Sequence, residues 1–325
     1  MQGTVLVTGG AGFIGSHVCD RLLAEGRRVI AVDDLSTGRI ANLAEARGYG
    51  PLFTFYNVDI RADALRTVVE RHGPEIVVHL AAQAGVRPSV RDPQFDASVN
   101  VLGLLNVLEA AAVAGTRKVV FTTSGGTIYG EPRTLPVKER ARHGSHPVSP
   151  YGITKKAAED YLEFYREARG LDYTILALAN VYGPRQDPHG EAGVVAIFSE
   201  LMLAGRQPTI NDDGNQTRDY VFVDDVVHAV ALSADKGSGH LLNIGTGLET
   251  SVNRIFQLLA AVIGYRGEPR FTPGAGGELR RIALDCEAAG RILGWRPWTH
   301  LEDGLAETVA WMREQGVGAK AAGAR

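Results

Sequence analysis

A glycine-rich loop between a predicted strand and a predicted helix is the feature that most constrains this chain. The strand is expected over residues 4–8 and an apolar helix over 13–24, and the loop between them reads Gly-Gly-Ala-Gly-Phe-Ile-Gly. Its glycines fit the G-x-G-x-x-G pattern, and three of them recur at every third position. Glycine is needed where backbone approaches a diphosphate, whose charge then rests on free N–H groups at the helix start. The residues expected to contact such a cofactor are Gly9, Gly12, Phe13, Ile14 and Gly15.

Two carboxylates follow the next predicted strand. This strand covers residues 28–32 and ends in Asp33, with Asp34 next to it, close to the expected spacing of about 20 residues. A carboxylate in that place can bind the ribose hydroxyls of a dinucleotide, and it repels the 2′-phosphate of NADP. The sequence therefore predicts NAD as the cofactor. This context disfavours the alternative of a tight strand-to-helix turn without a ligand.

Strands and helices go on alternating through the first half of the chain. Each predicted strand is short, rich in β-branched residues and followed by a helical stretch, which is typical of a parallel sheet covered on both faces. The expected fold class is α/β, with a Rossmann-like doubly wound parallel sheet. Ligands of such sheets bind beyond the carboxyl ends of the strands, so Asp59, Ala81 and Ser124 should converge with the glycine loop on one crevice. The later strands are predicted over 52–56, 75–79, 118–122 and 172–178.

The regular alternation ends after Asn180, where a long turn-rich loop covers residues 183–190. We place the start of a second, smaller α/β lobe there and expect it to bind the substrate. A helix predicted over 226–234 returns to the first lobe, so the two lobes interleave. The expected boundaries are 1–179 with 221–244 for the NAD-binding domain, 180–220 with 245–315 for the second lobe, and 316–325 for a disordered tail.

A tyrosine and a lysine stand four residues apart at the start of another predicted helix. Ser149 suits the N-cap and Pro150 the first helical position, and Tyr151 and Lys155 then share one helix face. An ammonium group beside a phenol lowers the pKa of the phenol, which makes the tyrosine a usable base near neutral pH. On these residues alone, a helix that merely begins with tyrosine and carries a solvated lysine stays open as an alternative. The residues expected to pack this helix are Ile153, Ala157 and Tyr161.

Composition disfavours several classes of protein. The net charge is −3 and no polybasic run occurs, so no nucleic-acid partner is expected. No secretory signal opens the chain and no apolar run is expected to reach the roughly 20 residues that span a bilayer, so we predict a cytoplasmic protein without membrane contact. The two cysteines, Cys19 and Cys286, give no disulfide framework, and the nine histidines offer no ligand spacing with a carboxylate, so no metal site is predicted.

With the glycine loop, Asp59-Ile60 and Tyr151-x-x-x-Lys155 in place, the chain resembles the extended short-chain dehydrogenase/reductase family, and within it the UDP-glucose 4-epimerases. The resemblance spans about residues 4–313. Further blocks that are similar to nucleotide-sugar enzymes lie at 180–185 and 218–225, and a block that is similar to bacterial epimerases lies at 187–195.

The resemblance implies an isomerase that uses NAD to invert carbon 4 of a UDP-sugar, with UDP-glucose and UDP-galactose as the expected pair. Tyr151 would take the proton of the 4-hydroxyl while NAD⁺ takes the hydride, and Lys155 would hold the cofactor ribose. The 4-keto sugar would then turn and regain the hydride on its other face, so NAD stays bound. UDP-N-acetylglucosamine or UDP-glucuronate 4-epimerisation and a non-catalytic dinucleotide sensor stay open as alternatives. A dehydratase or decarboxylase is less expected, because residues 124–127 carry no titratable group.

The resemblance also assigns residues to the two ligands. Asp33 and Asp34 would contact the adenosine ribose of NAD, and Asp59 and Ile60 its adenine. The middle of the cofactor is expected at Ala81, Ala82 and Asn100, and the nucleotide sugar at Ser124, Tyr151, Asn180, Val195, Arg218 and Arg281.

Two of these residues have structural alternatives. The planar guanidinium of Arg218 matches the oxygens of a diphosphate, but a surface ion pair with Asp219 or Asp212 would also account for it. Asn180 would hold the nucleotide sugar, or it would serve as a turn residue at the end of a strand.

The chain departs from the family pattern at the catalytic hydroxyl. The usual serine falls at Gly125, so Ser124 is the hydroxyl that we expect to orient the sugar, with Thr127 as the second choice. Ser124 and Thr127 are considered only because they lie one residue before and two residues after Gly125.

A second departure concerns the diphosphate. The arginine that is usual in the family falls at Ala275, so Arg280 or Arg281 substitutes for it or the phosphate clamp is weaker. Ile282 occupies the position thought to gate bulkier N-acetylated sugars, and a β-branched residue there does not decide the substrate.

The family also implies a homodimer. Its interface would use helices at 93–114 and 149–169 in a four-helix arrangement. The apolar residues of the first helix could equally face the sheet, so the sequence does not decide between these two orientations.

Overall fold

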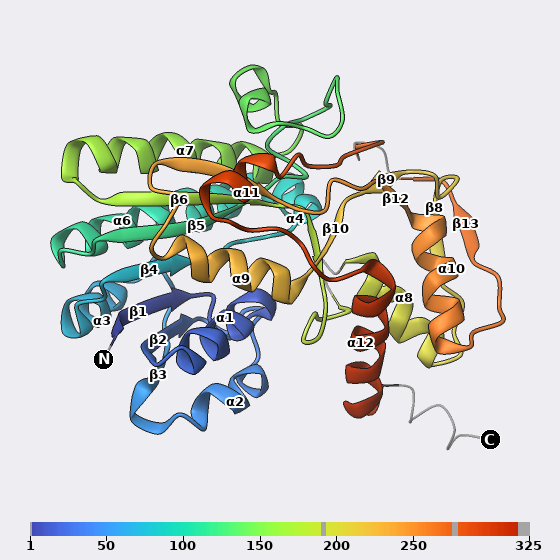
Figure 1. The fold of residues 1–325 in the computed structure, drawn as a ribbon, viewed down its shortest axis with the longest axis horizontal. Helices are drawn as coiled ribbons and strands as arrows, with labels where there is room; N and C mark the ends of the chain where they lie inside the picture. Colours follow the sequence, from blue (N-terminus) through green and yellow to red (C-terminus); the bar gives the residue numbers. More distant parts are fainter. Residues whose placement is uncertain (1, 190–192, 275–278, 318–325) are drawn as a thin grey trace.

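The structure is a computed structural model, and it describes residues 2–189, 193–274 and 279–317. Its centre is a sheet of seven parallel strands in the order β11-β6-β5-β4-β1-β2-β3. The chain moves outward from β1 in both directions, which confirms the predicted doubly wound Rossmann-like sheet (Figure 1). The strands are β1 Gln2–Thr8, β2 Arg27–Asp33, β3 Phe53–Asn57, β4 Ile76–His79, β5 Lys118–Ser124, β6 Asp172–Leu178 and β11 His240–Ile244.

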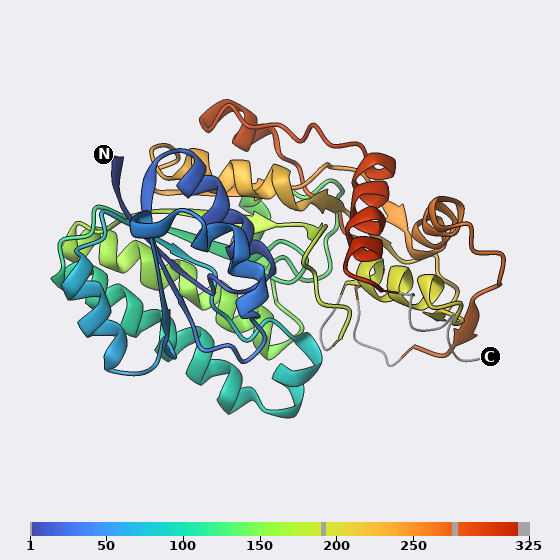
Figure 2. The same ribbon diagram turned by 90° about the horizontal axis from the view of Figure 1, so that it is seen from below.

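Helices cover both faces of this sheet, and a hydrophobic core lies on each side (Figures 1 and 2). Neighbouring residues of β1 belong to different cores, since Val5 and Val7 pack with one core and Leu6 with the other. All three are fully buried, which explains why the central strands read as unbroken apolar runs. One face carries α1 Phe13–Ala24 and α9 Val223–Ser233, and the other carries α3 Ala64–His72, α6 Leu104–Val113 and α7 Pro150–Arg169.

A smaller group of helices and short strands lies beyond the sheet, on the right in Figure 1. Two stretches of chain build it, and between them α9 and β11 return to the sheet, where β11 pairs with β6. Its helices are α8 Val194–Leu203, α10 Val252–Ile263 and α12 Leu301–Glu314. Its paired strands are β7 Asn180–Tyr182 with β10 Tyr220–Phe222, β8 Thr209–Asn211 with β13 Arg270–Thr272, and β9 Thr217–Arg218 with β12 Thr250–Ser251.

Short helices fill the connections between the larger elements. The short helices are α2 Ala44–Arg47, α4 Val86–Arg91, α5 Pro93–Ala97, α11 Glu287–Ile292, the 3₁₀ turns Ile40–Leu43, Gly50–Leu52 and Glu139–Gly144, and the π-helical turn η3 Ser98–Gly103.

One continuous helical stretch, Pro93–Val113, is long and apolar enough to span a membrane by length and composition. The prediction that no apolar run would come near this length is therefore wrong. Half of its most apolar window is buried inside the protein, which is usual for a core helix.

Helix α7 begins as predicted but packs with a different face. The Ser149 side chain accepts a hydrogen bond from the Gly152 N–H, and Pro150 is the first helical residue. Ile153 and Tyr161, however, are 56% and 37% exposed, so the predicted packing face is wrong. The buried face of α7 includes Tyr151, Lys155, Ala158 and Leu162.

Candidate active site

The glycine loop forms a tight backbone cradle between β1 and α1. Gly9 has φ = +69°, a conformation that glycine adopts without strain. A methyl group on Gly15 would collide with the carbonyl oxygen of Gly9, so the loop can close only without a side chain there. Gly12 is the N-cap of α1 and supplies no side-chain cap, which leaves first-turn N–H groups of this helix for an anion. The backbone therefore fits the diphosphate of a dinucleotide.

Asp33 supports this cradle from the end of β2. Its carboxylate accepts hydrogen bonds from the Ala11 N–H at 3.0 Å and the Leu35 N–H at 2.8 Å. Burial raises the pKa of Asp33, and these bonds act in the opposite direction. The neighbouring Asp34 accepts from the backbone and hydroxyl of Ser36. Asp33 therefore orders the glycine loop, and its contact with the ribose stays a prediction.

A hydroxyl and an imidazole join β1 to β4 behind the cradle. Thr8 Oγ1 lies 2.7 Å from His79 Nδ1, and it accepts from the Ala81 N–H at 3.3 Å. Burial, helped by the charge of Lys155, lowers the pKa of His79 to about 3, so this ring stays neutral. Thr8 and His79 were not among the predicted site residues, although both lie at strand ends, the same signal that pointed to Ala81.

Asn100 fixes the segment that follows β4. Its Oδ1 accepts from the Gln83 N–H at 2.9 Å, and its Nδ2 donates to the Gln83 carbonyl at 3.0 Å. Asn100 lies in the π-helical turn η3, a local irregularity that often marks a functional site. Ala81 and Ala82 precede this anchored residue, so the structure brings the three predicted cofactor residues together.

The predicted adenine contacts lie further along the same sheet edge. The Asp59 carboxylate is held by a fork of hydrogen bonds from Arg61 at 2.5 to 3.0 Å, which lowers the pKa of Asp59. Ile60 is 5% exposed and packs beneath Gly103. The Asp59 carboxylate is therefore already bound by Arg61, and its contact with adenine stays a prediction.

Tyr151 and Lys155 lie buried on the sheet side of α7. Lys155 Nζ donates to the Thr122 carbonyl at 3.1 Å and lies 4.7 Å from the ring centre of Phe121. The Tyr151 N–H donates to Ser89 Oγ at 3.2 Å, which ties the start of α7 to α4. The pair is thus placed against β5, whose carboxyl end carries the predicted hydroxyl.

The pKa values of this pair differ from the expectation. Burial, together with the nearby Asp96 carboxylate, raises the pKa of Tyr151, whereas the sequence predicted that Lys155 would lower it. Burial lowers the pKa of Lys155 to about 8. The prediction was wrong for the protein alone because it counted the ammonium group and not the loss of water around both side chains.

Ser124 and Asn180 face the same small space. A methyl group built on Gly126 would lie 3.8 Å from Ser124 Oγ and 3.9 Å from Asn180 Oδ1. The hydroxyl of Thr127, in contrast, donates to the Ser124 carbonyl at 3.3 Å. At Gly125 a methyl group would lie 2.5 Å from Leu284 Cδ1, so a serine at this position would require the Leu284 side chain to move. This arrangement favours Ser124 over Thr127 as the working hydroxyl.

Arg218, a predicted substrate residue in the smaller group of helices and strands, already makes a hydrogen bond within the protein. Arg218 Nη1 donates to the Thr217 carbonyl at 2.8 Å. Asp219, the suggested alternative partner, is buried and accepts hydrogen bonds from Thr246, and from the backbone of Gly247 and Leu284. Its carboxylate therefore orders the surrounding loops.

Val195 is 1% exposed in α8, so its side chain is part of the core. The substrate contact predicted for this residue requires its backbone or a movement of the helix.

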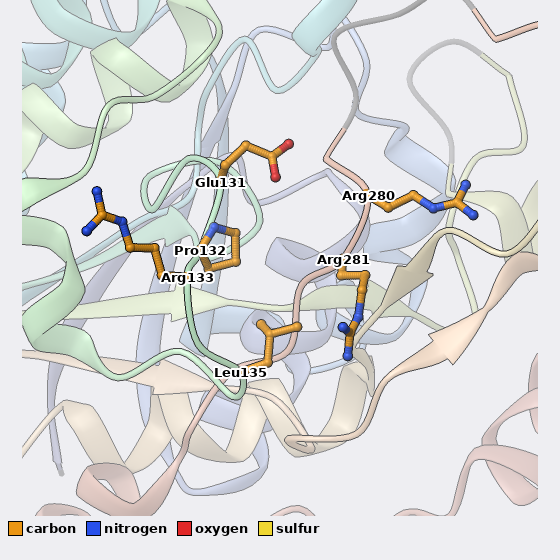
Figure 3. Close-up of a pocket in the computed structure, with 6 residues that line it drawn as sticks. All are labelled: Glu131, Pro132, Arg133, Leu135, Arg280 and Arg281. Carbon is orange, nitrogen blue, oxygen red and sulfur yellow. The ribbon is translucent and has the colours of Figure 1, made fainter.

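Arg281 lines a pocket of about 280 Å³ (Figure 3). Its backbone forms a parallel bridge with Thr217, the residue before Arg218, so the pocket lies close to Arg218. Arg280 is paired with Asp213 at 2.8 Å and Arg281 with Glu249 at 2.5 Å, so each would have to exchange its partner to bind a phosphate. Figure 3 shows both arginines on one segment, opposite the loop of the other lining residues. The pocket is lined by Glu131, Pro132, Arg133, Leu135, Arg280 and Arg281.

Other predictions about this region have different outcomes. Ala275, where the family has an arginine, lies outside the described residues, as does most of the predicted tail at 318–325. Within the described part of the chain, no cluster of three or more metal-binding side chains occurs. Cys19 and Cys286 are both free thiols.

A dinucleotide cradle and a buried tyrosine–lysine pair on one doubly wound sheet define the class of short-chain dehydrogenases/reductases. The model of the NAD dependent epimerase/dehydratase family matches residues 5–245. The chain belongs to this family, which confirms the predicted family and its cofactor, NAD.

The chain is similar to several proteins over nearly its whole length. A UDP-glucose 4-epimerase of Mycolicibacterium smegmatis is 50% identical over 95% of this chain and 98% of its own length. The crystal structure of a UDP-glucose 4-epimerase of Thermotoga maritima with UDP-glucose has a TM-score of 0.92 and 48% identity, and covers 96% of this chain and 99% of that one. The Thermus thermophilus UDP-glucose 4-epimerase in complex with NAD has a TM-score of 0.88 and 40% identity, with 95% and 99% covered.

Proposed function

We propose that this chain is an isomerase that interconverts UDP-glucose and UDP-galactose by NAD-dependent epimerisation at carbon 4. The observation that carries the proposal is the buried Tyr151–Lys155 pair, held against β5 on the sheet that also carries the glycine cradle. The relatives named above, which are similar over 95% or more of this chain, support the substrate.

The residues of the site divide the chemistry between them. NAD⁺, when bound, would supply the acceptor for the hydride of the sugar carbon and the donor that restores it on the opposite face. Tyr151 Oη takes the proton of the 4-hydroxyl and later gives it back. Ser124 Oγ hydrogen-bonds the same hydroxyl and keeps it in reach. The Lys155 ammonium holds the cofactor ribose, and its charge favours the phenolate of Tyr151.

The second group of helices and strands closes the site. We propose that 180–220 and 245–315 form the substrate lobe and that 1–179 with 221–244 form the NAD-binding domain. Arg218 and Arg281 then meet the diphosphate, with Arg280 as the alternative to Arg281. A cytoplasmic location stays a prediction.

A substrate panel tests the function directly. Purified protein should equilibrate UDP-glucose with UDP-galactose without added NAD, since the cofactor stays bound through turnover. UDP-N-acetylglucosamine and UDP-glucuronate, in parallel samples, should react much more slowly, and chromatography of the nucleotide sugars measures all three. If none of the three reaches its 4-epimer, the epimerase assignment is wrong. If UDP-glucuronate reacts fastest, only the substrate assignment is wrong.

An apolar surface on α6 and α7 supports the predicted homodimer. Ile153 and Phe164 are 56% and 57% exposed, and Leu102 on η3 is 62% exposed. A surface hollow in this region has walls from both helices. Its lining residues are Leu105, Ala157, Asp160, Tyr161, Phe164 and Tyr165. We propose that a second copy of the chain covers this surface.

A charge placed in this surface should separate the subunits. Phe164→Glu puts a carboxylate where a second copy would bury a ring, so we expect a monomer in light scattering with unchanged circular dichroism. Phe271→Glu is the matched control, because Phe271 is 53% exposed on β13, outside α6 and α7. A Phe164→Glu protein with the mass of the wild type would place any dimer interface elsewhere.

A further inference from the structure

Asp96 is a buried carboxylate that the proposed chemistry does not use. It lies on α5, its side chain is fully buried, and it occupies both oxygens in hydrogen bonds. Oδ1 accepts from Gln83 Nε2 at 2.9 Å and from Asn100 Nδ2 at 3.0 Å. Oδ2 accepts from the Thr154 hydroxyl at 2.8 Å. All three donors are neutral, so no cation touches this carboxylate among the described residues.

The orientation of the two amides shows that Asp96 is an acceptor. Gln83 Oε1 accepts from the Gly85 N–H at 2.5 Å, so its other end, Nε2, must be the group that faces Asp96. Asn100 Oδ1 accepts from the Gln83 N–H, which likewise directs Nδ2 to Asp96. Two N–H donors therefore meet at one oxygen. This arrangement suits an ionised carboxylate, although burial raises the pKa of Asp96.

These bonds connect three segments that carry predicted site residues. Gln83 belongs to the segment after β4 with Ala81 and Ala82, and Asn100 belongs to η3. Thr154 lies on α7 directly before Lys155. One side chain thus fixes the register of the cofactor segment against the helix of the tyrosine–lysine pair.

The same side chain also sets the charge behind that pair. Asp96 is the charged group that acts on both Tyr151 and Lys155. His79, which lies near Lys155, is neutral, and α4, the helix that packs on α5, carries Arg87 and Arg91. An anion here favours the ammonium form of the lysine and disfavours the phenolate of the tyrosine.

We propose that Asp96 is a positioning residue of the epimerase site, which joins the cofactor segment to α7 and places a fixed negative charge behind Tyr151 and Lys155. This inference rests on the proposed function only where it concerns turnover. The bonding itself and the effect on the tyrosine are properties of the chain that do not depend on turnover.

Asp96→Asn separates the charge from the hydrogen bonds. The new amide keeps Oδ1 as acceptor for Gln83 and Asn100, and its Nδ2 can donate to Thr154 Oγ1. The Thr154 hydroxyl can then donate to the Tyr151 carbonyl, which lies 3.1 Å away. We therefore expect a folded protein with bound NAD and an unchanged KM for UDP-glucose.

The pH profile of kcat should move as a whole. Without the Asp96 charge, the pKa of Tyr151 falls and the pKa of Lys155 falls as well, so both limbs shift to lower pH by about one unit. A role in packing alone would change the height of the profile and leave its limbs in place. Thr154→Val removes one bond and keeps the charge, so it should lower kcat without moving the limbs.

Asp92→Asn is the matched control, because Asp92 is an exposed N-cap carboxylate of the same helix and lies outside the network. A readout without turnover is the ultraviolet tyrosinate titration of the holoenzyme, taken as the difference from Tyr151→Phe. If the limbs and the titration of Asp96→Asn match those of the wild type, the proposal is overturned. If wild-type protein shows no epimerisation but the titration shifts, the proposed function fails and the role of Asp96 stands.

Discussion

Tyr151→Phe should lower kcat for UDP-glucose about a thousand-fold while the protein keeps its fold and its NAD. The phenol oxygen is the only atom that this change removes, and the ring that packs against the sheet stays. Ser124 and Thr127 carry no group that titrates in the usual pH range, so no neighbouring hydroxyl can replace it as a base. Steady-state kinetics gives the loss of activity, and the absorbance of released cofactor gives the NAD content.

Tyr165→Phe provides the control on the same helix. Its hydroxyl donates to Glu109 at 2.5 Å, away from the glycine cradle, so the change costs about 1 kcal/mol of stability and leaves kcat unaltered. Equal activity of Tyr151→Phe and the wild type would show that the proton goes to another group. Loss of NAD from Tyr151→Phe would assign the residue to cofactor binding alone.

Features that depend on a few adjacent residues could be predicted from the sequence. The helix over Phe13–Ala24, the N-cap Ser149 and the strand over Asp172–Leu178 all have the predicted bounds. Glycine spacing, capping and strand composition each act over a few residues, so their signal is local. The doubly wound class of the sheet could be predicted because parallel strands with helical crossovers have few possible arrangements.

The sequence does not predict which face of a helix packs on the sheet and which face stays at the surface. Helix α7 has two apolar stripes, one with Ala158 and Leu162 and one with Ile153 and Phe164, and both recur at helical spacing. The period of a helix says that a stripe will be covered, and not whether the sheet or another chain covers it. For this reason the stripe predicted to pack on the sheet was the wrong one.

The role of Asp96 could not be predicted for a related reason. It lies 13 residues after Gln83 and 58 residues before Thr154, so its partners meet only in the folded chain. The raised pKa of Tyr151 has the same origin, since burial and the Asp96 charge are both tertiary effects.

A substitution at Gly15 in the glycine cradle should cause a large loss of NAD affinity, because the backbone around Gly15 leaves no space for a side chain. The nearest atoms to a methyl group there are the carbonyl oxygen and carbon of Gly9 and the Cα of Gly10, all of them backbone. Gly15→Ala must therefore push α1 away from the loop, and we expect NAD affinity to fall at least about a hundred-fold.

Equilibrium dialysis of the refolded apoprotein measures the change in affinity, and activity without added NAD should disappear. Gly290→Ala is the control, since Gly290 lies inside α11 and its methyl group would be 3.5 Å from the nearest atom. It should leave NAD affinity unchanged and keep or slightly raise the melting temperature. Wild-type affinity in Gly15→Ala would mean that the loop relaxes without cost, and the diphosphate would then have to rest on groups other than the first turn of α1.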